Sequence, residues 1–482
     1  MAGKRYNGAM ISEPTSSGAS GRVSPSPSKP GNPGGKRAVY TLFAIVVLGS
    51  ALGGLSQTGV NAMMADIMAD FGAGVELGQW LTTSYMLVLG ITVPASTYLQ
   101  RRFCTKTQVL LAFALFVAGV VLDLAAPSFP VLLGGRILQA VAAGILLPVM
   151  QTVAMVGFGP GKQATAMGIA GVALGFAPNI GPTVGGALSF AWGWRSFFAL
   201  MLVLLAALVL WTLAAVRRQP SADASARLDG VSLGQSTLGF GGVLLGFSNA
   251  SSFGLASLYV WVPVAAGALF LVLFVRRQRR VDDPLISMKI FRNTRFAWGF
   301  VAQCLLTASF MGITLLVPLY VQGLCGGTAL DAGMVLLPGT VAALVLNPLA
   351  GVMTDRVGIR PVALVGGVLL VAGAVSMAFL SADTPLWASM ALQGVRACGV
   401  STLIGPLTAW SLEGLPRNAV ADGSAFSIAS RQATASFGTS VMVLCVSAGS
   451  LSLLGPVAYN VAFAFAAAMA LCLMICIVAK VR

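Results

Sequence analysis

The chain has 482 residues, 57% of them hydrophobic and only 9% charged, which excludes a water-soluble protein because soluble domains average about 25% charged residues. The absence of histidine excludes His-ligated metal sites and Ser-His-Asp triads, and the seven cysteines are scattered in apolar runs rather than spaced as a disulfide framework. The net charge of +15 could suggest a nucleic-acid ligand, but in a membrane protein the placement of the charges decides their meaning.

The first segment, residues 1–36, is rich in Ser, Gly and Pro and carries several basic residues. Such a composition cannot bury a core, so a disordered cytoplasmic tail is expected. The segment is also too polar for a signal peptide, and the apolar run that follows it continues past signal length.

Fourteen apolar runs follow the tail, each close to the roughly 20 residues that cross a bilayer as a helix. Their approximate limits are 39–65, 79–98, 107–126, 129–151, 164–190, 196–216, 231–249, 258–275, 297–321, 332–353, 361–380, 386–410, 423–447 and 457–479. The run 231–249 is the weakest because it is rich in glycine and polar residues. The fold class predicted is therefore an all-α integral membrane protein with 14 transmembrane helices.

The basic residues test this topology. If both termini are cytoplasmic, every Lys and Arg except Arg136, Arg195, Arg396 and Arg431 lies on the cytoplasmic side. Arg195 is then in an outer loop, and the other three lie inside apolar runs. This asymmetry follows the positive-inside rule. It predicts a multi-pass protein of the cell membrane with cytoplasmic N- and C-termini, and it removes the reason to expect nucleic acid.

Two polar tracts, 217–230 and 276–295, flank the seventh and eighth runs. They predict an N-terminal six-helix bundle at 37–218, a linker with two helices at 219–295 and a C-terminal six-helix bundle at 296–482. A weak internal repeat supports this division: TYLQRRFCTK after the second run corresponds to GVMTDRVGIR after the tenth, and an intramembrane arginine follows each. Parallel repeats of this size are typical of secondary transporters.

The stretch GGRILQAVAAGILLP (134–148) places Arg136 and Gln139 on one helix face. A charged side chain inside a bilayer costs about 2.5–3.5 kcal/mol even on insertion scales, so Arg136 is expected to face a wet cavity or an acceptor. The alternative is an arginine that snorkels to the outer leaflet. The other two membrane arginines, Arg396 and Arg431, pose the same question.

The first run carries Ser56, Gln57, Thr58 and Asn61 within about one and a half turns. So many polar groups favour a water-lined cavity over a single contact with a neighbouring helix. Asp66, near the outer end of the run, is the candidate proton carrier; the alternative is a solvated aspartate. Asp331 and Asp123 lie at the rims of their runs, and no carboxylate is expected deep within any helix, although proton coupling normally needs one.

The segment 167–186 is rich in glycine and contains two prolines. Glycines let two membrane helices approach closely, and prolines bend a helix. The segment is therefore either a hinge or a site of tight packing; its residues are Gly175, Pro178, Gly181, Pro182, Gly185 and Gly186. Near the cytoplasmic side, Asp355 and Arg356 in GVMTDRVGIR could cap a neighbouring helix or form an ion pair and so latch one conformation. A plain solvated turn is the alternative.

Several of these segments, taken in order from about residue 40 to 480, resemble the 14-helix drug:proton antiporter branch of the major facilitator superfamily. The similar segments are QWLTTSYML (79–87), RILQAVAAGILLP, GPTVGG with WGWRSFF (192–198), LDG (228–230), DPLISMKIFRN (283–293), LLPG (336–339), DRVGIR and ASRQATASFGTS. Each is weak alone, and together they are specific.

The resemblance implies two bundles that rock around a central cavity, with export driven by proton entry. It places the family's arginine at Arg136 and its hinge motif on the glycines and prolines of 175–186. Tyr85 is assigned to the same substrate path as Arg136, Gln139, Ser56, Gln57 and Asn61. The chain departs from the family at Ser56, where an acid is frequent, and at Arg101, where an aspartate is expected and an arginine cannot make the same latch.

No nucleotide-binding motif or catalytic cluster is present, so an enzyme and a nucleotide-driven pump are not expected, and no cofactor or metal is implied. The predicted function is proton-driven efflux of amphipathic small molecules or drugs, by a chain expected to work as a monomer in the lipid bilayer. The alternative is a dedicated exporter or importer of one metabolite, with or without proton coupling. The three membrane arginines favour neutral or anionic substrates over cations.

Overall fold

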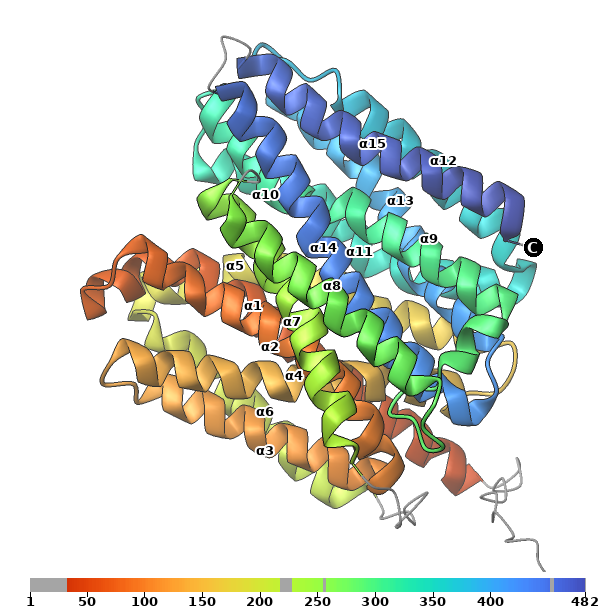
Figure 1. The fold of residues 1–482 in the computed structure, drawn as a ribbon. Coiled ribbons are helices and arrows are strands. Elements are labelled where there is room, and N and C mark those ends of the chain that lie inside the picture. Colours follow the sequence, from red (N-terminus) through yellow and green to blue (C-terminus); the bar gives the residue numbers. More distant parts are fainter. Residues whose placement is uncertain (1–32, 217–227, 255–256, 451–454, 482) are drawn as a thin grey trace, which may run out of the picture.

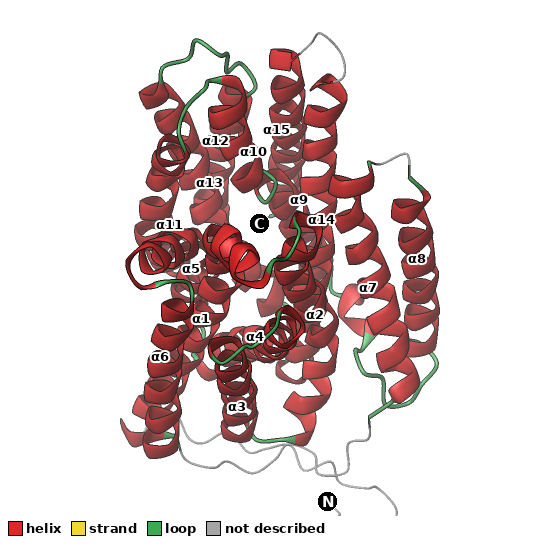
Figure 2. Ribbon diagram, turned by 90° about the vertical axis from the view of Figure 1, so that its left-hand side faces the viewer, coloured by secondary structure: helices red, strands yellow, loops and turns green. Residues whose placement is uncertain are grey.

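The computed structural model describes residues 33–216, 228–254, 257–450 and 455–481, and all regular elements in these ranges are helices (Figure 2). The predicted tail lies outside the described residues up to position 32, and the first helix begins at Pro33. The long helices are α1 (Pro33–Phe71), α2 (Val75–Arg102), α3 (Thr105–Leu124), α4 (Phe129–Gly157), α5 (Gln163–Trp192), α6 (Arg195–Ala215), α7 (Gly230–Phe253), α8 (Leu258–Gln278), α9 (Thr294–Phe310), α11 (Ala329–Val357), α12 (Ile359–Met377), α13 (Leu386–Glu413), α14 (Val420–Ser450) and α15 (Gly455–Lys480).

Each predicted apolar run coincides with a helix, and only the run 297–321 is interrupted. There the chain forms α9, the short α10 (Ile313–Leu319) and a π-turn, η2 (Tyr320–Leu324). Pro318 has no amide hydrogen to continue the helical ladder, which accounts for the change of helix type. Short 3-10 turns, η1 (Met288–Arg292) and η3 (Arg417–Ala419), precede α9 and α14.

Ten helical segments of the described chain are long and apolar enough to cross a membrane. The segment Thr294–Leu324 counts as one of them, and α2, α7, α13 and α14 fall outside the set. These four helices carry more polar residues because they face other helices: α13, for example, buries Gln393, Arg396 and Ser401. These segments identify a multi-pass membrane protein, while the count of 14 spans stays a prediction.

The helices form two groups that meet along two seams (Figure 1). Helices α1 to α6 contact one another, and α9 and α11 to α15 contact one another. Across the groups, α5 lies against α11 and α13, and α14 lies against α2 and α4. We refer to these groups as the N half and the C half; the exact boundaries at 218 and 296 remain a prediction.

Helices α7 and α8 pair with each other at one side of the molecule, and α7 contacts both α2 and α14 (Figure 2). The hydroxyl of Ser440 on α14 donates to the carbonyl of Phe247 on α7. Asp229 caps the start of α7 and accepts a hydrogen bond of 2.9 Å from Arg277 of α8, and this bond holds the pKa of Asp229 below its usual value. The pair therefore covers the α2–α14 seam and leaves the α5–α11 seam uncovered.

Candidate functional site

A buried polar network centres on Arg136 of α4. Its Nη1 donates to Ser56 Oγ at 2.6 Å and to Gln139 Oε1 at 2.8 Å, and its Nη2 donates to the Ser56 carbonyl at 3.0 Å. The guanidinium also lies over the ring of Tyr85, 4.5 Å from its centroid. All four side chains are buried. The structure thus brings together four of the six residues that the sequence assigned to the substrate path, and Arg136 does not snorkel.

The network ends at a carboxylate that the sequence analysis placed at the rim. Gln139 Nε2 donates to Asp123 Oδ2 of α3 at 2.6 Å, and Asp123 has no exposed surface. Asp123 is the second-last residue of α3, so it lies at the end of its helix and not deep within it, yet its side chain is buried. Nothing in the sequence indicated this burial, because a position at a helix end ordinarily suggests exposure to water. Gly135 makes the burial possible, since a Cβ there would lie 1.9 Å from Asp123 Oδ1.

The other two residues assigned to the substrate path, and the candidate proton carrier Asp66, are less buried than this network. Gln57 is partly buried, and Asn61 is exposed and accepts a hydrogen bond of 2.6 Å from Thr82. Asp66 is exposed and accepts a hydrogen bond from Ser189 of α5. A further exposed polar residue, Asn179 in the middle of α5, was not assigned to the path. Polar side chains exposed in mid-helix are the signal that marks a wet face.

The C half contains the other two membrane arginines. Arg396 is buried on α13, and its Nε donates to Gln393 Oε1 at 2.9 Å. Arg431 on α14 is partly buried and donates to Gln303 Oε1 of α9 at 3.2 Å. Gln303 also donates to Ser411 at 2.7 Å. The acceptors of these arginines are thus neutral amides.

The glycines of the predicted hinge motif pack α5 against its neighbours. A Cβ at Gly181 would lie 2.2 Å from Thr58 Oγ1, and one at Gly185 would lie 2.4 Å from the Gly59 carbonyl. Helix α5 continues through Pro178 and Pro182, and the freed Pro178 carbonyl accepts a hydrogen bond of 2.6 Å from Thr58. These contacts satisfy the tight-packing alternative, and a hinge role stays a prediction.

We predict that Gly185→Ala destabilises the protein by about 1–3 kcal/mol, because the added methyl group has no space against α1. Gly186→Ala is the matched control, since its Cβ would lie 3.6 Å from the nearest atom, that of Ala62. Thermal unfolding of the purified protein in detergent measures both. Equal melting temperatures for the two variants would show that the stripe does not set the α1–α5 distance.

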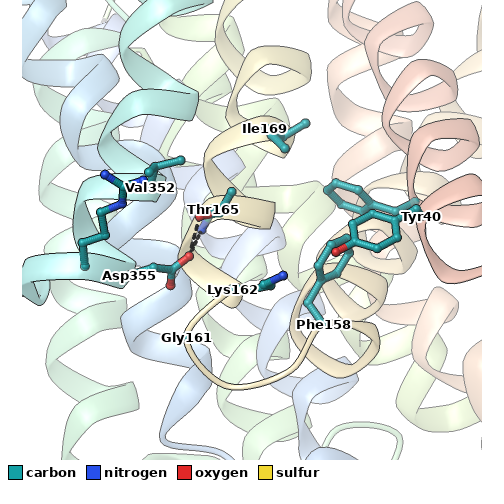
Figure 3. A pocket seen from close by; sticks show the side chains of 10 residues that line it. Tyr40, Phe158, Gly161, Lys162, Thr165, Ile169, Val352 and Asp355 are labelled. Atoms are coloured by element: carbon teal, nitrogen blue, oxygen red, sulfur yellow. Dashed lines mark hydrogen bonds between the residues drawn. The ribbon is translucent and has the colours of Figure 1, made fainter. Parts of the chain in front are cut away.

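One contact between the halves involves the predicted latch residue Asp355. It lies near the end of α11, and its carboxylate accepts hydrogen bonds from the backbone amides of Ala164 and Thr165 at 3.2 and 2.7 Å. Figure 3 shows Asp355 pointing at Thr165 beside a cavity of 320 Å³ that Tyr40 and Lys162 also line. A carboxylate of the C half therefore caps the first turn of α5 in the N half. Its neighbour Arg356 is exposed at the cavity edge.

A second contact between the halves uses the residue that departs from the family pattern. Arg101, at the end of α2, donates two hydrogen bonds of 2.9 Å to the carboxylate of Asp422 in the first turn of α14. Asp422 is buried and also accepts from the Ser287 amide at 2.9 Å. Arg101 thus joins the halves as a hydrogen-bond donor, whereas Asp355 joins them as an acceptor. We call these two contacts the latches. Nothing in the sequence pairs Arg101 with Asp422, which is 321 positions away.

Both latches lie at one end of the molecule, which we call the basal end: α1, α5 and α14 begin there, and α2 and α11 end there. Close packing joins the halves nearby, since a Cβ at Gly168 would lie 2.4 Å from the Asn347 carbonyl. At the other end, the distal end, Asn61 and Asp66 are exposed. Polar contacts and close helix packing therefore join the halves at the basal end.

Comparisons with known proteins agree with this architecture. The family model of the Major Facilitator Superfamily matches residues 46–439. The chain is 34% identical to the uncharacterized MFS-type transporter YcnB of Bacillus subtilis, over 84% of this chain and 86% of the relative. It is 32% identical to the lincomycin resistance protein LmrB of the same organism, over 85% and 86% of the two chains.

Among solved structures, the proton:xylose symporter XylE, bound to 6-bromo-6-deoxy-D-glucose, is similar with a TM-score of 0.65 and 12% identity, over 91% of this chain and 95% of the other. At that identity the likeness concerns the fold alone. The family match and the relatives, together with the paired helical halves, lead to one conclusion: the chain belongs to the Major Facilitator Superfamily of membrane transporters.

Proposed function

We propose that this protein exports amphipathic small molecules across the cell membrane by alternating access, driven by proton entry. The observation that carries the proposal is the contrast between the ends of the molecule: two polar latches close the basal end, while polar side chains of α1 are exposed at the distal end. The relatives support export, because LmrB of Bacillus subtilis is named for lincomycin resistance.

The proposal includes the orientation of the chain. Basic residues cluster at the basal end, as in Arg101, Arg102 and Lys106, and the positive-inside rule then places this end in the cytoplasm together with both termini. The described conformation is the outward-facing one. We further propose that the chain has 14 spans and works as a monomer.

Proton coupling needs a carboxylate whose environment changes during the cycle. Asp66 is the candidate from the sequence, and its exposure lets it reach protons from the distal side. Asp123 is a second candidate, because a proton on its buried carboxylate would remove the charge that faces Arg136 through Gln139. Either residue can bind the proton only if water reaches it in one conformation.

We predict that Asp66→Asn weakens transport driven by a pH gradient without affecting folding, and that Asp123→Asn abolishes that response. The amide keeps the size of the side chain but cannot ionise. Dye transport in proteoliposomes, with and without an imposed pH gradient, measures the response. A variant that keeps the full response to the gradient would remove its residue from the coupling mechanism.

The experiment that tests the proposed function is transport in proteoliposomes with an imposed pH gradient and a panel of neutral, cationic and anionic compounds. Acceleration of at least one class by the gradient, in the antiport direction, is expected. Absence of transport across the whole panel would overturn the proposal.

A dedicated transporter of one metabolite is the second candidate, because the same fold serves it. Comparison of the medium of a deletion strain with that of its parent separates the two. A single compound retained in the deletion strain, with no change in sensitivity to drugs, would favour the dedicated transporter.

A further inference from the structure

The two halves differ in the balance of buried charge. In the N half, Gln139 joins Arg136 to the buried carboxylate of Asp123. In the C half, Arg396 and Arg431 donate only to the amides of Gln393 and Gln303 in the hydrogen bonds found for the described residues. The described residues form four ion pairs, two by Arg101 and one each by Arg195 and Arg277, and none of them includes Arg396 or Arg431.

The carboxylates of the C half are committed elsewhere or lie at the surface. Asp355 caps α5, and Asp422 binds Arg101. Asp331 forms a capping box with Thr328 at the start of α11. Asp383 is exposed in the turn before α13, and Glu413 is exposed as the last residue of that helix. Within the described residues, the C half therefore holds two membrane arginines and no carboxylate to neutralise them.

The internal repeat shows where a counter-charge would be expected. Gly119 of α3 packs against Gln139, and Gly373, at the same distance from the start of α12, packs against the backbone of Arg396. One turn after Gly119 the N half has Asp123. One turn after Gly373 the C half has Met377, which is buried in an apolar cluster. Arg396 thus occupies the position that corresponds to Gln139 of the N half, and Met377 occupies the position that corresponds to Asp123.

A buried guanidinium needs acceptors for its hydrogen bonds. Arg396 is 3% exposed, and its Nη1 has no partner among the described residues. Arg431 keeps some exposed surface and lies on α14, whose residues Ala425 and Ile428 belong to the same apolar cluster as Tyr85 of the N half. Of these two unneutralised cations, Arg431 lies on a helix that meets the N half and keeps exposed surface, so it is the one placed to attract an anionic ligand.

We propose that the substrates of this transporter are anionic amphiphiles, and that Arg431 binds their anionic group. This inference rests on the proposed function and narrows its substrate class. Arginine suits a carboxylate or a phosphate because its planar fork can donate two parallel hydrogen bonds. The aliphatic and aromatic part of the substrate would occupy the remaining space between the halves.

The test uses two dyes with the same xanthene ring system: fluorescein, an anion at neutral pH, and tetramethylrhodamine methyl ester, a cation. Purified full-length protein in liposomes is assayed by counterflow, with the leak of protein-free liposomes subtracted. We expect fluorescein transport to exceed that of the cation. We also expect Arg431→Gln to slow fluorescein transport by about tenfold or more, the effect of losing a charge-assisted hydrogen bond.

Arg417→Gln is the matched control, because Arg417 is an exposed arginine of the same half in η3; its transport is expected to equal that of the wild type. Folding is checked by thermal unfolding. Fluorescein is expected to raise the melting temperature of the wild type and of Arg417→Gln, but not of Arg431→Gln.

The outcomes separate this inference from the proposed function. Transport of the cation without the anion, or unchanged fluorescein transport in Arg431→Gln, would overturn the anionic substrate class and leave a small-molecule transporter. Transport of neither dye in counterflow, nor of any compound in the wider panel, would overturn the proposed function and this inference with it.

Discussion

Replacing Arg136 by alanine is expected to lower transport at least about a hundredfold, while the chain still inserts into the membrane. The change removes donors to Ser56 and Gln139 and leaves Asp123 buried without a nearby cation. Because Gln139 stands between Arg136 and Asp123, the loss of stability should stay below the penalty of about 3–5 kcal/mol that follows when one partner of a direct buried ion pair is removed. Arg136→Lys should retain part of the activity, since lysine keeps the charge but lacks the planar fork that reaches both acceptors.

The double variant Arg136→Met with Asp123→Asn separates stability from mechanism. Neutralising both partners should restore most of the melting temperature lost in Arg136→Met, because no unpaired charge stays buried. Transport should remain absent. Full activity of Arg136→Ala in proteoliposomes would show that the network serves neither transport nor its coupling.

Substitution of the contact between Arg101 and Asp422 at the basal end is the second change with a large expected effect. Arg101→Gln leaves the buried carboxylate of Asp422 without its bidentate partner, so the closed basal end should be destabilised and transport should fall by about tenfold or more. Arg101→Asp combined with Asp422→Arg restores an ion pair of opposite direction and should recover part of the transport. Recovery stays incomplete because Asp422 also accepts from the Ser287 amide.

A double-mutant cycle on the melting transition gives the coupling between the two latch residues, for which we expect about 1–3 kcal/mol. Arg102→Gln is the control, since it removes the adjacent charge without touching Asp422. If the cycle gave no coupling, or if Arg102→Gln had the same effect as Arg101→Gln, the contact would be a local surface charge effect and not a latch between the halves.

The segment GVMTDRVGIR suggested that Asp355 could cap a neighbouring helix, and the structure shows that cap on α5, while its role as a latch stays a prediction. The Arg101 latch was not predictable. An arginine at that place suggested that the latch was lost, whereas the structure shows the end of α2 joined to the start of α14, with the arginine as the donor. The partner, Asp422, lies on α14, and only the approach of α2 to α14 brings the two side chains together.

The amino-acid sequence by itself determined the membrane class, the helical runs and the candidate residues Arg136, Gln139 and Ser56. These follow from local properties: apolar length, the placement of basic residues, and helical spacing. Only the tertiary structure decided that Asp123 is buried, that Gly185 faces Gly59, and that the arginines of the C half lack a carboxylate. The physical reason is that lipid is as apolar as leucine, so the hydrophobic pattern does not say which face of a membrane helix meets which neighbour. Close packing and polar contacts between distant residues make that choice.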